Sequence, residues 1–115
     1  MLIDTHAHLN FNAFSQDRDA VIKDCLKKGI SAVNVGSNFF TSQKAVEIAE
    51  KYPGFWSAVG LHPIHLASNL QEDEDEDPTD EKDFDYQKYK ELAQNPKVVA
   101  IGEIGLDYYY LPKDR

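Results

Sequence analysis

The sequence DTHAHL occupies positions 4–9, directly after the apolar run MLI at positions 1–3. The apolar run predicts a short buried strand, and side chains two positions apart in a strand leave on the same face. His6 and His8 can therefore reach one point, and imidazole nitrogen is the commonest side-chain ligand for zinc and related divalent metals. We interpret the pair as metal ligands at a strand end. The alternative is two inert, hydrogen-bonded polar residues.

The rest of the chain alternates strand and helix patterns. Further strands are predicted where apolar runs end in glycine or glutamate, over 31–36, 55–60 and 98–103. Helices are predicted where apolar residues recur at helical spacing: from Ser15 or Asp17 to about Lys28, from Thr41 or Ser42 to about Lys51, and over 84–95.

This order, βαβαβαβ, predicts an α/β fold with a parallel sheet and right-handed crossovers. Four such strands form either an open doubly wound sheet or the first half of an eight-stranded TIM barrel. The chain contains no GxGxxG or GxxxxGK[ST] motif, which an open sheet usually carries after its first strand. We therefore prefer a truncated barrel, whose site residues follow the strand ends. The candidates there are His6, His8, Asn34 to Asn38, His62, His65 and Glu103.

The motif GLHP at positions 60–63 follows the third predicted strand. Proline holds the preceding residue in an extended conformation, which gives His62 a defined direction. We expect His62 to contact a substrate phosphate or to transfer a proton. The alternative is a turn histidine without chemistry, and His65 is expected at the surface.

The motif IGEIGLDYY at positions 101–109 follows the fourth predicted strand. A carboxylate in this apolar segment is costly unless a partner neutralises it. The cation implied by the two histidines is the simplest partner for Glu103, which can also bridge two ions; the alternative is a lysine or arginine. Gly102 and Gly105 are expected to allow close backbone approach or unusual dihedral angles. Asp107 is expected to contact substrate or to support a ligand.

Composition excludes several classes of protein. The hydrophobic fraction of 42% is ordinary for a soluble globular protein. No apolar stretch approaches the ~20 residues that cross a bilayer, and the N-terminus lacks the pattern of a signal peptide. We therefore expect a cytoplasmic protein that does not enter a membrane. The single cysteine, Cys25, cannot form an internal disulfide and is expected to be a small buried residue.

The net charge of −8 is a local feature. Residues 72–85 hold ten acids and one lysine, whereas the other 101 residues carry ten acids and eleven bases. We interpret residues 71–83 as a solvated, mobile insertion that cannot bury enough apolar area to fold by itself.

Together, DTHAHL, VGLHP and IGEIGLDYY resemble the N-terminal half of the TatD family of metal-dependent deoxyribonucleases, within the amidohydrolase-type TIM barrels. HxH alone is shared with many amidohydrolases, but GEIGLDYY is close to diagnostic. The resemblance implies a hydrolase that cleaves DNA phosphodiester bonds with two divalent ions, Mg²⁺, Zn²⁺ or Mn²⁺. It implies the following site: His6 and His8 as first-metal ligands, Glu103 as the bridging carboxylate, His62 near the substrate phosphate, and Asp4 as a supporting residue.

The chain departs from this family in length. Members are full barrels of roughly 250 residues, so the resemblance implies that the second half of the barrel, with further metal ligands, is missing from residues 1–115. We expect this fragment to be inactive alone, to have exposed edge strands and to need a C-terminal half-barrel chain. The acidic insertion is expected to lower DNA affinity, and Tyr108 to Tyr110 to stack on an unpaired base.

Two alternatives stay open. The first is a metal-dependent amidohydrolase acting on a small amide, lactone or phosphotriester. Such enzymes often bridge their metals with a carbamylated lysine, so the setting of Glu103 argues against it. The second is a non-catalytic half-barrel or interaction module.

Overall fold

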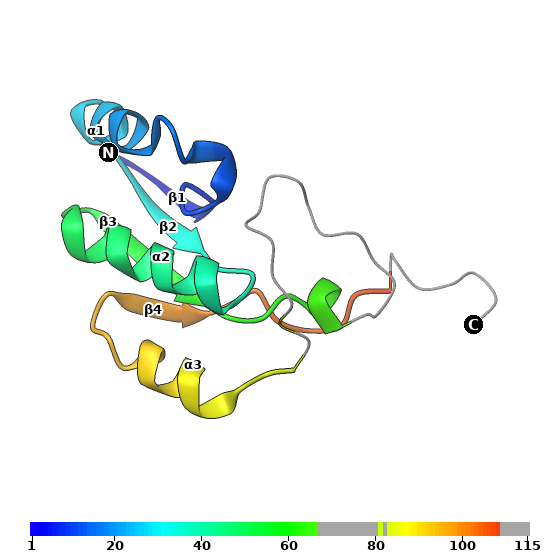
Figure 1. The fold of residues 1–115 in the computed structure, drawn as a ribbon. Helices are drawn as coiled ribbons and strands as arrows, with labels where there is room; N and C mark the ends of the chain where they lie inside the picture. The colour runs from blue at the N-terminus through cyan, green and yellow to red at the C-terminus, as the bar shows by residue number, and fades with distance from the viewer. Residues whose placement is uncertain (67–80, 82, 109–115) are drawn as a thin grey trace.

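The computed structural model of the chain describes residues 1–66, 81 and 83–108 (Figure 1). Strands and α-helices alternate along these residues, as predicted. The strands are β1 (Leu2–Ala7), β2 (Ile30–Val35), β3 (Phe55–Val59) and β4 (Val98–Ile101). The helices are α1 (Arg18–Lys27), α2 (Phe39–Lys51) and α3 (Tyr86–Ala93), with 3₁₀ turns at Asn12–Phe14 and Pro63–Leu66.

The four strands pair in parallel and in chain order, β1-β2-β3-β4. A doubly wound sheet reverses its strand order at a switch point, whereas a barrel adds each strand beside the previous one. Helix α1 contacts β2, α2 contacts β2 and β3, and α3 contacts β3 and β4 (Figure 1). The fold is therefore α/β and is consistent with the N-terminal part of a TIM barrel.

The hydrophobic core lies between the sheet and its helices. Ala32 and Phe55 pair across β2 and β3, and both belong to a buried cluster with Ile22 of α1 and Ile48 of α2. Full burial of a side chain such as Phe55 contributes about 1.5–3 kcal/mol. Cys25 packs against this cluster but is only partly buried, so the prediction of a buried cysteine holds in part.

The two edge strands are exposed. Leu2 and Ile3 of β1 are 70% and 56% exposed, and Val99 and Ile101 of β4 are 54% and 56% exposed. The prediction that β1 is buried is therefore wrong for this chain, because β1 has a neighbour on one side only. The exposed edges expected for half a barrel are confirmed.

The helix ends differ from the sequence prediction in detail. Helix α2 begins at Phe39 rather than at Thr41 or Ser42, because Asn38 and Thr41 form a reciprocal capping box. Asp17 precedes α1 but makes no side-chain capping hydrogen bond. Gly29, with φ +73°, follows the end of α1 as predicted. None of the helices in the described ranges is long and apolar enough to cross a membrane.

One end of the predicted acidic insertion is anchored. The Glu81 carboxylate accepts a hydrogen bond from the Phe39 backbone N–H at 2.8 Å and another from the Tyr89 hydroxyl at 2.6 Å. Burial, followed by this hydrogen bond, raises the pKa of Tyr89. The prediction of a solvated insertion is therefore wrong at Glu81. The negative charge of Glu81 lies at the N-terminus of α2, where it stabilises the helix. Residues 71–80 and 82 lie outside the described residues, as do Tyr109 and Tyr110.

Candidate metal centre

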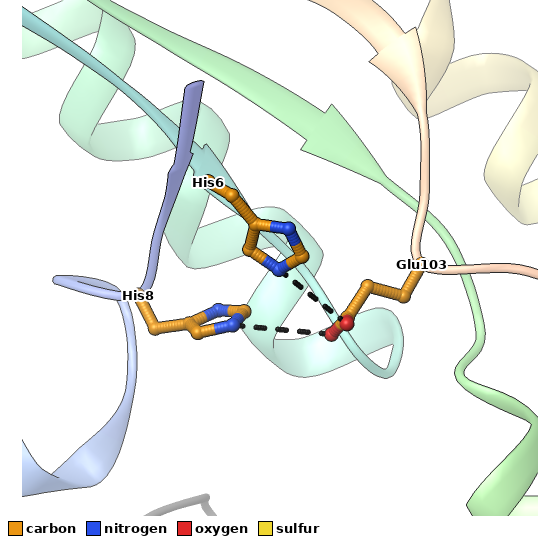
Figure 2. Close-up of side chains that lie close together, drawn as sticks. All are labelled: His6, His8 and Glu103. Atoms are coloured by element: carbon orange, nitrogen blue, oxygen red, sulfur yellow. Dashed lines mark ion pairs between the residues drawn. The ribbon is translucent and has the colours of Figure 1, made fainter. Parts of the chain in front are cut away.

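The candidate site joins the two edges of the sheet. His6 lies on β1, His8 follows the end of that strand, and Glu103 follows β4. In a flat sheet, four strands spaced about 4.8 Å apart would separate these edges by roughly 14 Å. The side chains nevertheless meet, as Figure 2 shows, so the sheet curls as a barrel wall does.

The donor atoms of the three side chains converge. His6 Nε2 lies 3.4 Å from Glu103 Oε1, and His8 Nε2 lies 3.9 Å from Glu103 Oε2 (Figure 2). One ligand atom from each residue lies within 4.8 Å of the others. In the described part of the chain, this trio is the only group of three or more histidine, cysteine or acidic residues close enough to hold one metal ion. Among the described residues, the ion pairs of Glu103 all involve histidines. The alternative of a lysine or arginine partner is therefore not supported.

The surroundings of His8 suit a metal ligand. His8 Nδ1 lies 2.9 Å from the Val35 carbonyl oxygen. A carbonyl can only accept, so Nδ1 must carry the hydrogen, which leaves the lone pair of the neutral ring on Nε2. That lone pair is the metal-binding group, and Nε2 is the atom that faces Glu103. The donor set of two imidazoles and a carboxylate fits a divalent cation, with the imidazoles favouring Zn²⁺.

His62 has the opposite tautomer. The Ile64 backbone N–H donates to His62 Nδ1 at 3.0 Å, so Nδ1 holds the lone pair and Nε2 carries the hydrogen in the neutral ring. His62 Nε2 lies 4.0 Å from Glu103 Oε1. In this state His62 presents a hydrogen-bond donor to the site rather than a ligand.

Three other candidate site residues, His65, Asn34 and Asn38, are buried away from the metal centre's open cavity. His65 is 1% exposed, so its predicted place at the surface is wrong. It lies in the 3₁₀ turn Pro63–Leu66, which directs its side chain into the protein. Asn34 and Asn38 were candidate reactive residues but are buried. Asn34 accepts the Leu9 backbone N–H, and Asn38 caps α2. Both therefore support the strand ends.

The two acids predicted beside the site are placed as follows. Asp4 accepts a hydrogen bond from the His6 backbone N–H at 3.0 Å, which suits a supporting role. Asp107 lines an open cavity of about 600 Å³ on the inner face of the sheet, together with His6, His62 and Glu103. The structure therefore places Asp107 in the cavity that His6 and Glu103 of the trio line.

The backbones of Gly60 and Gly102 approach each other closely. A Cβ atom at Gly60 would lie 2.7 Å from the backbone of Gly102, whereas a Cβ at Gly102 would meet nothing within 4 Å. The Glu103 backbone N–H donates to the Gly36 carbonyl at 3.0 Å. The close backbone approach expected at Gly102 is therefore confirmed, with Gly60 as the residue whose missing Cβ permits it, and Gly105 has the expected unusual φ, +117°.

Comparison with known proteins identifies the family. The model of the family described as TatD related DNase matches residues 3–115. This chain belongs to the TatD family. The predicted resemblance is confirmed.

Curated relatives of this TatD-family chain include a protein named as a metal-dependent hydrolase and proteins named as exonucleases. The chain is 38% identical over 117 residues to "Uncharacterized metal-dependent hydrolase YabD" of Bacillus subtilis, covering 99% of the chain and 41% of that protein. It is 35% identical over 109 residues to "3'-5' ssDNA/RNA exonuclease TatD" of Erwinia billingiae, and 34% identical over 108 residues to the protein of that name in Escherichia fergusonii. These matches cover 93% of the chain and 37% of each exonuclease. The chain thus spans about two fifths of the length of these relatives.

The TatD-family motifs rest on polar supports that the sequence patterns did not reveal. Arg18 of α1 donates to the carbonyls of Leu9 and Phe11 at 2.6 and 2.8 Å, which fixes the loop after β1. Asn10 is fully buried beneath the same loop. The only sequence signal for either residue is a polar side chain close to the HxH motif.

Proposed function

We propose that this chain is the N-terminal part of a divalent-metal-dependent hydrolase that cleaves phosphodiester bonds in DNA. The observation that carries the proposal is the convergence of His6, His8 and Glu103 from the two edges of the sheet. Membership of the TatD family and the exonuclease names of several relatives support this substrate class.

We assign His6, His8 and Glu103 as the residues that hold metal. The two oxygens of Glu103 face His6 and His8, so the three side chains would hold one divalent cation together. A second ion, with Glu103 shared between the two, is proposed from the family resemblance alone. When bound, such ions activate water and neutralise the charge that develops on the phosphoryl group. Mg²⁺, Mn²⁺ and Zn²⁺ remain the proposed candidates, with the imidazoles favouring Zn²⁺.

The remaining assigned residues act on the substrate. His62 donates from Nε2–H to a phosphate oxygen, because its Nδ1 is occupied by the Ile64 N–H. Asp107 lines the same open cavity and is assigned to substrate binding. No element that reads base edges is assigned, so we expect low sequence specificity.

The exposed edges and inner face need cover for activity. We propose that a C-terminal half-barrel, present in proteins of the relatives' length, covers them and supplies further ligands. The chain alone is then expected to be inactive. A cytoplasmic location stays a prediction from the sequence.

The test is a cleavage assay on end-labelled single-stranded DNA. The chain is assayed alone and with the C-terminal part of the Bacillus subtilis relative, with Mg²⁺, Mn²⁺ or Zn²⁺ and with a chelator. We expect metal-dependent cleavage only in the complemented sample. Glu103→Gln should abolish this cleavage, whereas Glu47→Gln, which alters an exposed glutamate on α2, should not. Cleavage that survives chelation or Glu103→Gln would contradict the proposal.

A further inference from the structure

The side chain of Asn10 lies fully buried below the loop that carries His8. Its Nδ2 group donates to two backbone carbonyls, Val35 O at 3.1 Å and Thr41 O at 2.9 Å. Both hydrogens of the amide are therefore used, and they tie the loop after β1 to the end of β2 and to the first turn of α2.

The Val35 carbonyl is shared between Asn10 and His8. It accepts from Asn10 Nδ2 and also lies 2.9 Å from His8 Nδ1. A carbonyl oxygen has two lone pairs, so one oxygen can accept both hydrogen bonds. The peptide of this carbonyl is already held in the sheet, because its Gly36 N–H donates to the Ala58 carbonyl at 2.9 Å. Asn10 therefore fastens the loop that carries His8 to a fixed acceptor, and the same acceptor determines which nitrogen of His8 carries hydrogen.

The stacking contact between the His8 ring and Phe11 cannot make this distinction. The Phe11 ring stacks on His8 with centroids 4.2 Å apart and planes inclined by 21°. Stacking restricts the plane of an imidazole but has no preference between its two nitrogens. Of the two contacts, only the Val35 carbonyl selects the tautomer with a lone pair on Nε2, the atom that faces Glu103 (Figure 2).

We propose that Asn10 is a positioning residue of the metal centre, which fastens the loop of His8 beside the Val35 carbonyl and so holds His8 in its ligand tautomer. The inference rests on the proposed function, because it takes His8 as a metal ligand. It is supported by the two carbonyl contacts of Asn10, which join the loop of His8 to the end of β2 and to the first turn of α2.

The test compares Asn10→Ala with Asn38→Ala in the full 115-residue chain. Both asparagines are fully buried, but Asn38 caps α2 and makes no hydrogen bond to the Val35 carbonyl. Two quantities are measured: the tautomer of His8 in the metal-free protein, from long-range ¹H–¹⁵N spectra of the imidazole, and Zn²⁺ affinity, by calorimetry. Zn²⁺ is the probe because imidazole binds it well, whereas the acidic residues favour harder cations.

We expect the unsubstituted chain to show His8 with hydrogen on Nδ1. Asn10→Ala should give a mixture of tautomers and weaken Zn²⁺ binding by about 10- to 100-fold, the usual effect of losing a group that orients a ligand. Asn38→Ala should keep the tautomer and bind Zn²⁺ within about threefold of the unsubstituted chain. Asn10→Ser, whose hydroxyl can donate to one carbonyl, should lie between these results.

Several outcomes would overturn the inference: an unchanged His8 tautomer in Asn10→Ala, an equal loss of Zn²⁺ affinity in Asn38→Ala, or failure of both Asn10 variants to fold, which circular dichroism would show. Failure of the proposed function gives a different result. In that case the unsubstituted chain binds no Zn²⁺, while the tautomer comparison still reports whether Asn10 orients His8.

Discussion

Nε2 of His6 lies 3.4 Å from Oε1 of Glu103, although the two residues belong to opposite edges of a four-stranded sheet. No local interaction can produce this contact, because it requires all three crossover connections to form with one handedness. The contact therefore depends on the curvature of the sheet, and any change that flattens the sheet should separate the donors.

The Gly60 backbone controls how closely the end of β4 approaches β3. We predict that Gly60→Ala destabilises the chain by about 1–3 kcal/mol, because its methyl group would overlap the Gly102 backbone. Zn²⁺ affinity should fall as well, since Glu103 follows the displaced backbone. Gly102→Ala is the matched control: its methyl group meets open space, so denaturant unfolding and Zn²⁺ binding should change little. Equal effects of the two substitutions would refute this explanation.

The tautomer of His62 predicts a separation between metal binding and catalysis. His62→Ala should leave Zn²⁺ affinity within about threefold of the unsubstituted chain, because Nε2 carries hydrogen and cannot serve as a ligand in that state. Cleavage of DNA by the complemented protein should fall by about 10²- to 10⁴-fold. Calorimetry and the cleavage assay measure the two effects. If His62→Ala lost as much Zn²⁺ affinity as His8→Ala, His62 would be a ligand and the tautomer assignment would fail.

The Glu81 carboxylate anchors one end of the acidic segment. Glu81→Ala should lower the free energy of unfolding by about 1–3 kcal/mol, since it removes the acceptor for the Phe39 N–H and the Tyr89 hydroxyl. It should also lower the pKa of Tyr89, which tyrosinate absorbance reports, although burial alone should keep that pKa above its ordinary value. Asp83→Ala, at an exposed neighbouring position, is the control. An unchanged Tyr89 titration in Glu81→Ala would contradict the assignment.

The Asp19 carboxylate links α1 to α2 and makes stability depend on pH. Hydrogen bonds from Tyr52 and Lys51 hold the pKa of Asp19 below its ordinary value. The contribution of this carboxylate is therefore present above about pH 3.9 and is lost as pH falls through the folded-state pKa. Asp19→Asn should flatten the acid limb of a plot of unfolding free energy against pH. Tyr52→Phe should flatten it as well, and an acid limb unchanged in both variants would show that other groups cause it.

The order of elements and the strand ends could be predicted because each depends on local pattern. Apolar runs define β2 and β3, and glycine closes α1 at Gly29, where the backbone has positive φ. The HxH spacing indicated that His6 and His8 share a face, since strand geometry alone determines that relation. These predictions needed no knowledge of which segments pack together.

Other features could not be predicted because they depend on tertiary contacts. Exposure of β1 depends on which strand lies beside it, and an apolar run carries no such information. Burial of His65 depends on the turn that follows β3. Asn10 supports the loop of His8 through a carbonyl of β2. A single polar residue beside the HxH motif does not predict a contact with another strand.

The central claim is that His6, His8 and Glu103 hold a divalent cation together. Isothermal titration of the 115-residue chain with Zn²⁺ tests it most directly, with His6→Ala, His8→Ala, Glu103→Gln and the surface control Glu47→Gln. Saturable binding that each of the three site substitutions weakens by at least about tenfold, and that Glu47→Gln leaves unchanged, is the predicted result. Binding that is absent from the unsubstituted chain, or equal in all five proteins, would contradict the claim.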